Sequence, residues 1–155
     1  MLFRSQVAIV RIDDAAITGT TADEVNAQLV GKKIGVCAGF TGGSFVDGDD
    51  ELEFPGIADA EKREFDNINL AMIELKNGTI DVIIMDDAVS NYAAAADANK
   101  DKVRVVDVRL TDEDYGIAVK KGDTELLGKI NKALDELKAE GYIDELVKKW
   151  ITDAQ

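Results

Sequence analysis

Two short stretches carry the groups best suited to binding chemistry, and the first is rich in glycine. Residues 39–44 read Gly-Phe-Thr-Gly-Gly-Ser, so they offer backbone N–H groups together with the hydroxyl of Thr41. These donors suit a carboxylate or a phosphate. The stretch is not a P-loop, because the Gly-Lys-Ser/Thr ending is absent, and it lacks the dinucleotide-binding fingerprint. Glycine-rich turns are common, so a purely structural turn stays open beside an anion site.

The second stretch is a pair of acids, Asp86-Asp87, that follows the apolar run Asp81–Met85. A carboxylate at the end of a buried strand can face a ligand cation. It can also cap a helix that begins near Ala88, since aspartate is favoured at N-caps. With two adjacent acids, one can take each role, and both roles stay open for Asp86.

A third acidic group, Asp47, Asp49 and Glu51, has the alternate spacing of a calcium loop. It fails the EF-hand pattern, because position six is not glycine and position twelve is not glutamate. Residues 47–66 hold nine acids against two bases, and they include the only proline. We expect a solvated loop between core elements there, with no metal site.

Composition excludes several classes of protein. The 155 residues, 46% of them hydrophobic, are enough for one ordinary domain. A net charge of −13 repels phosphate backbones and anionic headgroups, so nucleic acid is not an expected partner. The absence of histidine excludes Ser-His-Asp and Cys-His catalysis, and the single Cys37 cannot form an intrachain disulfide. We expect no catalytic residues, no metal and no other cofactor.

Membrane insertion and export signals are not indicated by the sequence. No apolar run approaches the roughly 20 residues that a membrane helix needs. The segment Met1–Gln6 is not followed by an apolar stretch that ends in a small-residue cleavage site. We therefore expect no direct insertion of this chain into a membrane.

Short β-branched runs alternate with helical patterns along the chain. The predicted strands are Val7–Ile12, Ile34–Ala38, Asp81–Met85, Val103–Val108 and Tyr115–Val119. Helices are predicted after the capping box Thr21–Glu24, over Ile68–Leu75 before Asn77-Gly78, over Ala88–Ala98, from Asp123 or Thr124 to Gly141, and around Leu146, Val147 and Trp150. This order predicts an α/β fold with a mainly parallel sheet flanked by helices. Ligands of such sheets bind beyond the carboxyl ends of the strands, which is where Thr41 and Asp86 are expected.

The strand ends and the tail together resemble extracellular solute-binding protein family 3, the polar amino-acid receptors of ABC importers. The matching stretches are Gly31–Val36 with the glycine turn, Leu75–Asp86, Tyr115–Gly122 and the closing run Leu126–Trp150. They cover nearly the whole chain. The resemblance implies a periplasmic binding protein-like type II lobe that is not an enzyme. It implies a small amino acid as ligand, a membrane permease as partner, and a periplasmic or extracellular, cell-surface location.

Family members have two lobes that close on the ligand, and this chain resembles the second lobe with the return segment. The resemblance implies a truncated start and hinge strand at 1–12 and the second lobe at 13–112. Residues 113–155 would be a return strand and C-terminal helices that normally pack on the first lobe. We expect that truncation removed the first lobe and the export signal. The apolar stripe from Leu127 to Trp150 would then need another surface.

The resemblance also assigns residues to the ligand. Thr41 would bind the α-carboxylate through its hydroxyl and backbone N–H, and Asp86 would accept the α-ammonium. Gly39, Phe40 and Gly42 would complete the turn around the ligand. Cys37 and Met85 stand where family members vary the residue that contacts the ligand side chain. Phe40 replaces the first of two usual threonines, and the acidic loop after Phe45 is longer than in the best-known members, so the ligand's identity is left open.

Other classes remain as alternatives. A receiver domain would use Asp13-Asp14, Asp86 and Lys120, but Asp86 lies 72 residues after Asp14, too far for the two short units between them. A dehydratase-like enzyme on the same fold would need a proton donor in the cleft. An input lobe of a signalling receptor would need a membrane helix, whereas only five residues follow Trp150.

Overall fold

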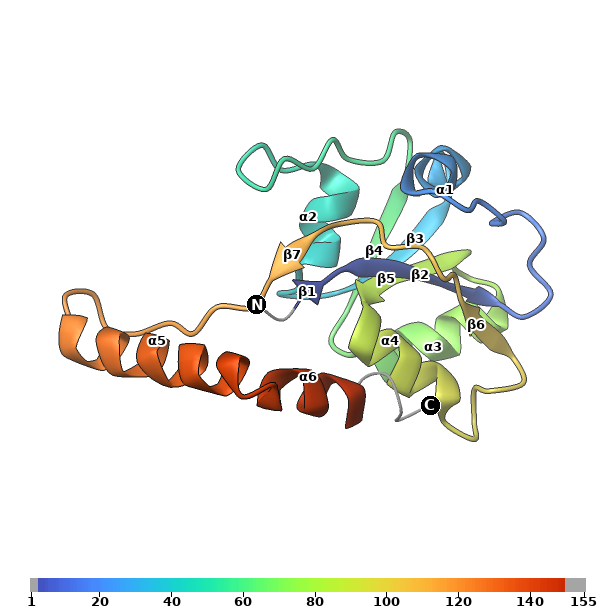
Figure 1. Ribbon diagram of the computed structural model, residues 1–155. Coiled ribbons are helices and arrows are strands. Elements are labelled where there is room, and N and C mark those ends of the chain that lie inside the picture. Colours follow the sequence, from blue (N-terminus) through green and yellow to red (C-terminus); the bar gives the residue numbers. More distant parts are fainter. Residues whose placement is uncertain (1–2, 150–155) are drawn as a thin grey trace. The chain divides into compact units, whose positions relative to one another are not determined.

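The computed structural model describes residues 3–149, and the chain divides into two units. The larger unit spans Arg4–Glu113, and the smaller one combines Phe3 with the chain from Asp114 onward. Figure 1 labels their elements. A two-stranded sheet of β1 (Phe3–Arg4) and β7 (Glu113–Asp114) lies where the chain passes from one unit to the other.

The larger unit is built on a five-stranded mixed sheet. The strands, in the order β4-β3-β5-β2-β6, are Glu61–Phe65, Lys33–Cys37, Val82–Asp86, Gln6–Arg11 and Val103–Val105. β3 pairs in parallel with both β4 and β5, whereas β2 is antiparallel to β5 and to β6. Four of the five strands therefore share one direction, and the predicted α/β class with a mainly parallel sheet is confirmed.

Helices cover both faces of this sheet (Figure 1). On one face, α1 (Ala22–Leu29) and α2 (Thr41–Asp47) contribute Val25, Leu29 and Phe45 to an apolar cluster. On the other, α3 (Ile68–Asn77) and α4 (Asp87–Ala95) contribute residues such as Met72 and Ala93. Strands buried on both sides need continuous apolar sequence, as the runs in β2 and β5 predicted.

Two of the predicted helix boundaries are set by local capping chemistry. The hydroxyl of Thr21 accepts a hydrogen bond from the backbone N–H of Glu24 at the start of α1. Gly78 takes a left-handed conformation with φ of 75° after α3, and its N–H bonds to the last carbonyls of that helix. Both boundaries are confirmed.

Three predictions about local structure are wrong. Tyr115–Val119 is not a strand: it pairs with no described strand, and Tyr115 and Ile117 are 51% and 60% exposed. Among residues 113–149, only Glu113–Asp114 (β7) form a strand. Thr41 does not lie in a turn but begins α2, which covers residues 41–44 of the glycine-rich stretch. The acidic segment 47–66 is not loop throughout, because its end forms the edge strand β4.

The smaller unit contains α5 (Thr124–Ala139) and α6 (Tyr142–Val147). Asp123 caps α5 by accepting a hydrogen bond from the N–H of Leu126. A surface ion pair joins Lys129 to Glu125 one turn away. Neither helix buries a side chain in the described part of the chain. Trp150, the end of the predicted apolar stripe, lies outside the described residues.

Candidate functional site

The two predicted ligand residues lie at the carboxyl ends of neighbouring strands in the middle of the large sheet. Asp86 is the last residue of β5, and Thr41 begins α2 four residues after the end of β3. Because β3 and β5 are neighbouring parallel strands, their carboxyl ends meet at the same edge. The larger unit thus brings Thr41 and Asp86 together, although 44 residues separate them in sequence.

A buried glutamine joins these two residues. Gln6 begins β2 and lies opposite Asp86 in the antiparallel pair. Its side-chain Nε2 donates to Asp86 Oδ1 over 2.7 Å and to Thr41 Oγ1 over 3.0 Å. Gln6 is fully buried and Asp86 is 3% exposed, so these bonds form away from bulk water.

Glu113 completes the network from the start of β7. Its Oε2 accepts a hydrogen bond from the Thr41 hydroxyl over 2.7 Å. Its Oε1 accepts from the hydroxyl of Thr111 over 2.7 Å and from Gln6 Nε2 over 3.2 Å. Thr41 therefore donates its hydroxyl hydrogen to a carboxylate in this structure.

The sequence analysis did not identify Gln6 or Glu113. Gln6 is one of several polar residues directly before the apolar run that starts at Val7, a signal too common to mark a site. Its pairing with Asp86 depends on β2 running antiparallel to β5, and this long-range pairing has no local sequence pattern.

Two glycines of the predicted turn, Gly39 and Gly42, suit their positions for different physical reasons. Gly39 has a φ of 79°, in the left-handed region that favours glycine. At Gly42, an added Cβ would come within 2.9 Å of the Ile84 carbonyl oxygen and 3.0 Å of Gln6 Oε1. Glycine at position 42 thus lets α2 approach β5 closely. Phe40, between them, is exposed at the N-cap of α2 and makes no side-chain capping bond.

The two acids after β5 have different partners. Asp87 Oδ1 accepts a hydrogen bond from the N–H of Ala88 in the first turn of α4. Asp86 is the N-cap residue by position, yet its side chain makes no capping bond and contacts Gln6 instead. Asp86 is therefore not held at this position by helix capping.

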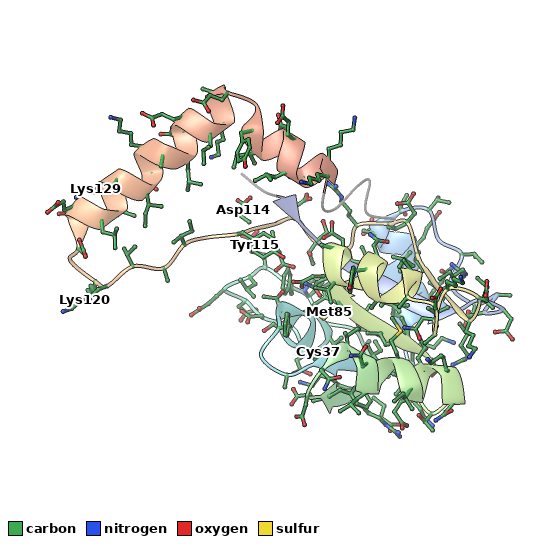
Figure 2. All side chains as sticks on the ribbon, turned by 90° about the horizontal axis from the view of Figure 1, so that it is seen from below. Cys37, Met85, Asp114, Tyr115, Lys120 and Lys129 are labelled. Carbon is green, nitrogen blue, oxygen red and sulfur yellow. The ribbon has the colours of Figure 1, made fainter. Side chains whose placement is uncertain are left out.

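Cys37 and Met85, on neighbouring strands, are buried in the apolar cluster beneath α3 and α4 (Figure 2). Burial raises the pKa of the Cys37 thiol, and the negative charge of Asp86 raises it further. Cys37 ends β3 and Asp86 ends the neighbouring parallel strand β5, so both lie at the same end of the sheet.

The acidic segment is held by its own contacts. Asp49 and Phe54 exchange backbone hydrogen bonds of 2.9 Å in each direction. Asp49 Oδ1 also accepts from the N–H groups of Glu51 and Leu52, and Asp47 forms an ion pair with Lys62. Within residues 3–149, no group of three or more acidic or cysteine side chains is placed to hold a metal ion.

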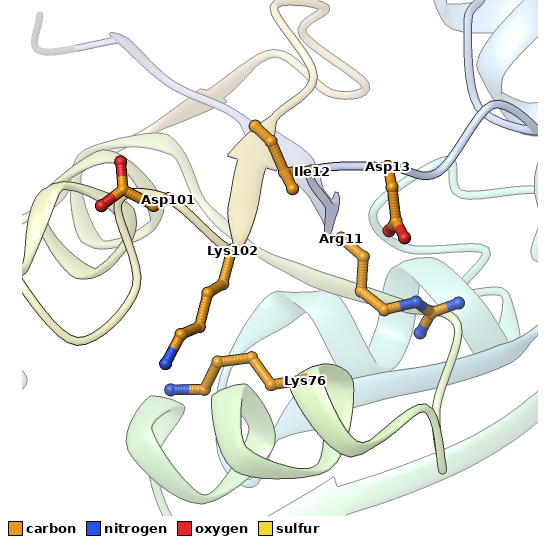
Figure 3. A pocket seen from close by; sticks show the side chains of 6 residues that line it. All are labelled: Arg11, Ile12, Asp13, Lys76, Asp101 and Lys102. Atoms are coloured by element: carbon orange, nitrogen blue, oxygen red, sulfur yellow. The ribbon is translucent and has the colours of Figure 1, made fainter.

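A hollow at the opposite end of β2 is lined by charged residues (Figure 3). Arg11 lies there beside Lys76 and Lys102, with Asp13 and Asp101 nearby. Arg11 Nη1 already donates to the carbonyls of Leu75 and Ile80. None of the predicted site residues lines this hollow, so it is separate from the network around Gln6.

The sequence profile of the bacterial extracellular solute-binding proteins, family 3, matches residues 3–153. The chain belongs to this family. It is 40% identical over 95 residues to the "ABC transporter glutamine-binding protein GlnH" of Bacillus subtilis (strain 168), covering 61% of this chain and 34% of that protein. It is 35% identical over 128 residues to the "Putative ABC transporter arginine-binding protein 2" of Escherichia coli (strain K12), covering 79% of this chain and 49% of that protein.

Solved structures of this fold agree with that assignment. The ancestral amino acid-binding protein AncCDT-1, described as a precursor of cyclohexadienyl dehydratase, superposes with a TM-score of 0.71 at 29% identity. The match covers 97% of this chain and 58% of that one. The chain thus spans between about one third and three fifths of the length of these relatives. No helix among its described residues is long and apolar enough to cross a membrane.

Proposed function

We propose that the larger unit is the second ligand-binding lobe of an amino-acid-binding protein that serves an ABC importer. Thr41 would bind the ligand α-carboxylate with its hydroxyl and backbone N–H, and Asp86 would accept the α-ammonium. The observation that carries the proposal is that one atom, Gln6 Nε2, is hydrogen-bonded to both residues. The bond to Thr41 Oγ1 is 3.0 Å and the bond to Asp86 Oδ1 is 2.7 Å.

This spacing fits the chemistry of an α-amino acid. Thr41 Oγ1 and Asp86 Oδ1 are separated by no more than those two bond lengths laid end to end. The ammonium and carboxylate of an α-amino acid are attached to one carbon, so a single ligand can reach both residues. Charge-assisted bonds of this kind contribute roughly 1.5 to 3 kcal/mol each.

The contact between Thr41 and Glu113 supports the carboxylate role. The hydroxyl of Thr41 already donates to a carboxylate oxygen over 2.7 Å, so its position and orientation suit such an acceptor. A ligand carboxylate would take the hydrogen bond that Glu113 now accepts. Binding would then release the Glu113 side chain from Thr41.

The remaining predicted residues would surround the ligand. Gly39, before α2, and Gly42, in its first turn, would lie beside the ligand, and the exposed ring of Phe40 would offer an apolar surface. Cys37 and Met85 would shape the floor beneath the ligand side chain. The relatives named for glutamine and arginine support an amino acid as the class of solute.

The proposed role is binding and delivery, with no chemical change of the ligand. The partner would be a membrane permease, and the location would be periplasmic or extracellular, as the family description implies. Residues 13–112 of the larger unit would form the second lobe, after the truncated start and hinge strand at 1–12. Residues 113–155 would be the return strand and C-terminal helices that normally pack on the first lobe.

Nuclear magnetic resonance of this chain tests the proposal residue by residue. L-Arginine and L-glutamine are the probes, and half a cleft should bind them weakly, with a Kd of about 1 mM or above. We expect the amide signals of Thr41 and Asp86 to shift with increasing amino acid. The double variant Thr41→Val with Asp86→Asn should lose these shifts. Shifts that survive the double substitution, or that are absent from the unsubstituted chain, would reject the assignment.

A further inference from the structure

The side chain of Gln6 is the point at which both proposed ligand residues are connected. It lies in the larger unit, is fully buried, and donates from one nitrogen atom to Asp86, Thr41 and Glu113. Gln6 is not one of the residues proposed to touch the ligand.

The backbone of Gln6 is fixed on both sides of its strand. On one side it pairs with Asp86 of β5. On the other, its N–H donates to Thr111 Oγ1 over 2.8 Å and its carbonyl accepts from the N–H of Leu110 over 2.9 Å. Because the side chain is also fully buried and its amide is hydrogen-bonded, it has little freedom to move and can hold its partners in place.

The directions of the hydrogen bonds follow from the chemistry of the groups. A side-chain amide nitrogen carries two hydrogens and cannot accept. One hydrogen serves the short bond to Asp86, and the other is shared between Thr41 and Glu113. Because the oxygen of Thr41 accepts from Gln6, its own hydrogen points to a different acceptor, which is Glu113 Oε2 in this structure.

Gln6 therefore sets the hydrogen-bond state of Thr41. With an amide donor beside it, the hydroxyl is directed to donate, as a ligand carboxylate requires. The same amide holds Asp86 Oδ1, the carboxylate proposed for the ligand ammonium. One side chain thus orders both contacts of an α-amino acid.

We propose that Gln6 is a positioning residue, which presents Thr41 as a hydrogen-bond donor and Asp86 as an acceptor to the two charged groups of the ligand. This inference rests on the proposed function. Gln6 does not touch the ligand and acts through Thr41 and Asp86.

The test uses Gln6→Met, which keeps the side-chain length and removes the donor. Its matched control is Gln28→Met on α1, where Gln28 Oε1 accepts from the N–H groups of Thr18 and Gly19 away from the site. Gln6→Asn, which keeps an amide of shorter reach, is measured as well in case the methionine variant does not fold. All variants are made in the 155-residue chain.

The first readout needs no ligand. Scalar couplings report the χ1 rotamer of Thr41, and we expect one rotamer in the unsubstituted chain and in Gln28→Met. Averaging between rotamers is expected in Gln6→Met and Gln6→Asn. Urea unfolding of each variant records the stability change separately.

The second readout compares L-arginine with its methyl ester, which lacks the carboxylate. The unsubstituted chain should prefer the free acid, and Gln6→Met should reduce that preference by about tenfold, the effect of roughly one hydrogen bond. A merely structural role would weaken both ligands equally. An unchanged Thr41 rotamer with an unchanged preference would overturn this inference alone. No binding to the unsubstituted chain would overturn the proposed function and this inference with it.

Discussion

Gln6 and Asp86 face each other across the antiparallel strands β2 and β5, and the amide of Gln6 donates to the carboxylate of Asp86 over 2.7 Å. The two residues are 80 positions apart in the sequence. Because β2 is antiparallel to the other four strands, its first residue lies beside the carboxyl end of β5. The reversed strand thus supplies the amide that connects the parts of the candidate site.

The hydroxyl of Thr41 is expected to carry the carboxylate contact. Thr41→Val keeps the shape of the side chain but removes the hydroxyl, so affinity for an amino acid should fall roughly 10-fold or more, the effect of one charge-assisted bond. Thr41→Ser keeps the hydroxyl and should retain most of the affinity. Calorimetric titration of a two-lobe protein that carries this lobe measures both, and equal affinities for the two variants would contradict the role.

The close approach of α2 to β5 makes a steric prediction. Gly42→Ala places a Cβ within 2.9 Å of the Ile84 carbonyl oxygen, and overpacking of this kind costs typically 1–3 kcal/mol of unfolding free energy. The displaced helix start should also shift the amide signal of Thr41.

Gly43→Ala is the matched control for this substitution. A Cβ at position 43 meets nothing within 4 Å, and the residue lies inside α2. Alanine stabilises a helix interior by roughly 0.5–1 kcal/mol relative to glycine. Urea unfolding should therefore move in opposite directions for the two variants, and equal destabilisation would refute the packing argument.

The Cys37 thiol should report the charge of Asp86. Burial is the larger cause of its raised pKa, and the charge of Asp86 is the smaller one. Asp86→Asn should therefore lower the thiol pKa in the folded protein but leave it above the ordinary value. Ultraviolet absorbance of the thiolate against pH measures this, and an unchanged titration would show that the two groups do not interact.

The same shift makes stability depend on pH in alkaline solution. The folded state holds the thiol proton more tightly than the unfolded state, so this contribution is complete below pH 9.0, the ordinary thiol pKa. It is lost as the pH rises through the higher pKa of the folded state. Cys37→Ala should lack this part of the alkaline loss in urea unfolding, whereas parallel curves for the two proteins would contradict the prediction.

Local sequence patterns predicted the elements whose boundaries depend on local contacts. The capping threonine of α1 and the Asn77-Gly78 stop of α3 act within a few residues, so they could be read directly. The strand β4 was missed because its sequence, Glu-Lys-Arg-Glu-Phe, is charged and it pairs only with β3 at the sheet edge.

The candidate site was predicted in part for the same reason. Asp86 ends one predicted strand and Thr41 follows another, so both could be placed at the carboxyl ends of the parallel strands from chain order alone. Gln6 and Glu113 reach them through pairings between distant segments, which no spacing in the sequence encodes. Tyr115–Val119 shows the opposite error, since an apolar run without a neighbouring strand does not form a ladder.

The central claim is that Asp86 binds the ammonium group of an amino acid. Asp86→Asn removes the charge but keeps an oxygen that can accept from Gln6, so the fold should be little affected. Asp97→Asn, at a side chain that is 95% exposed, is the control for loss of one negative charge. Calorimetric titration with L-arginine and L-glutamine in the two-lobe protein should show affinity lowered roughly 10- to 150-fold by Asp86→Asn and unchanged by Asp97→Asn. Undiminished affinity in a folded Asp86→Asn protein would contradict the account.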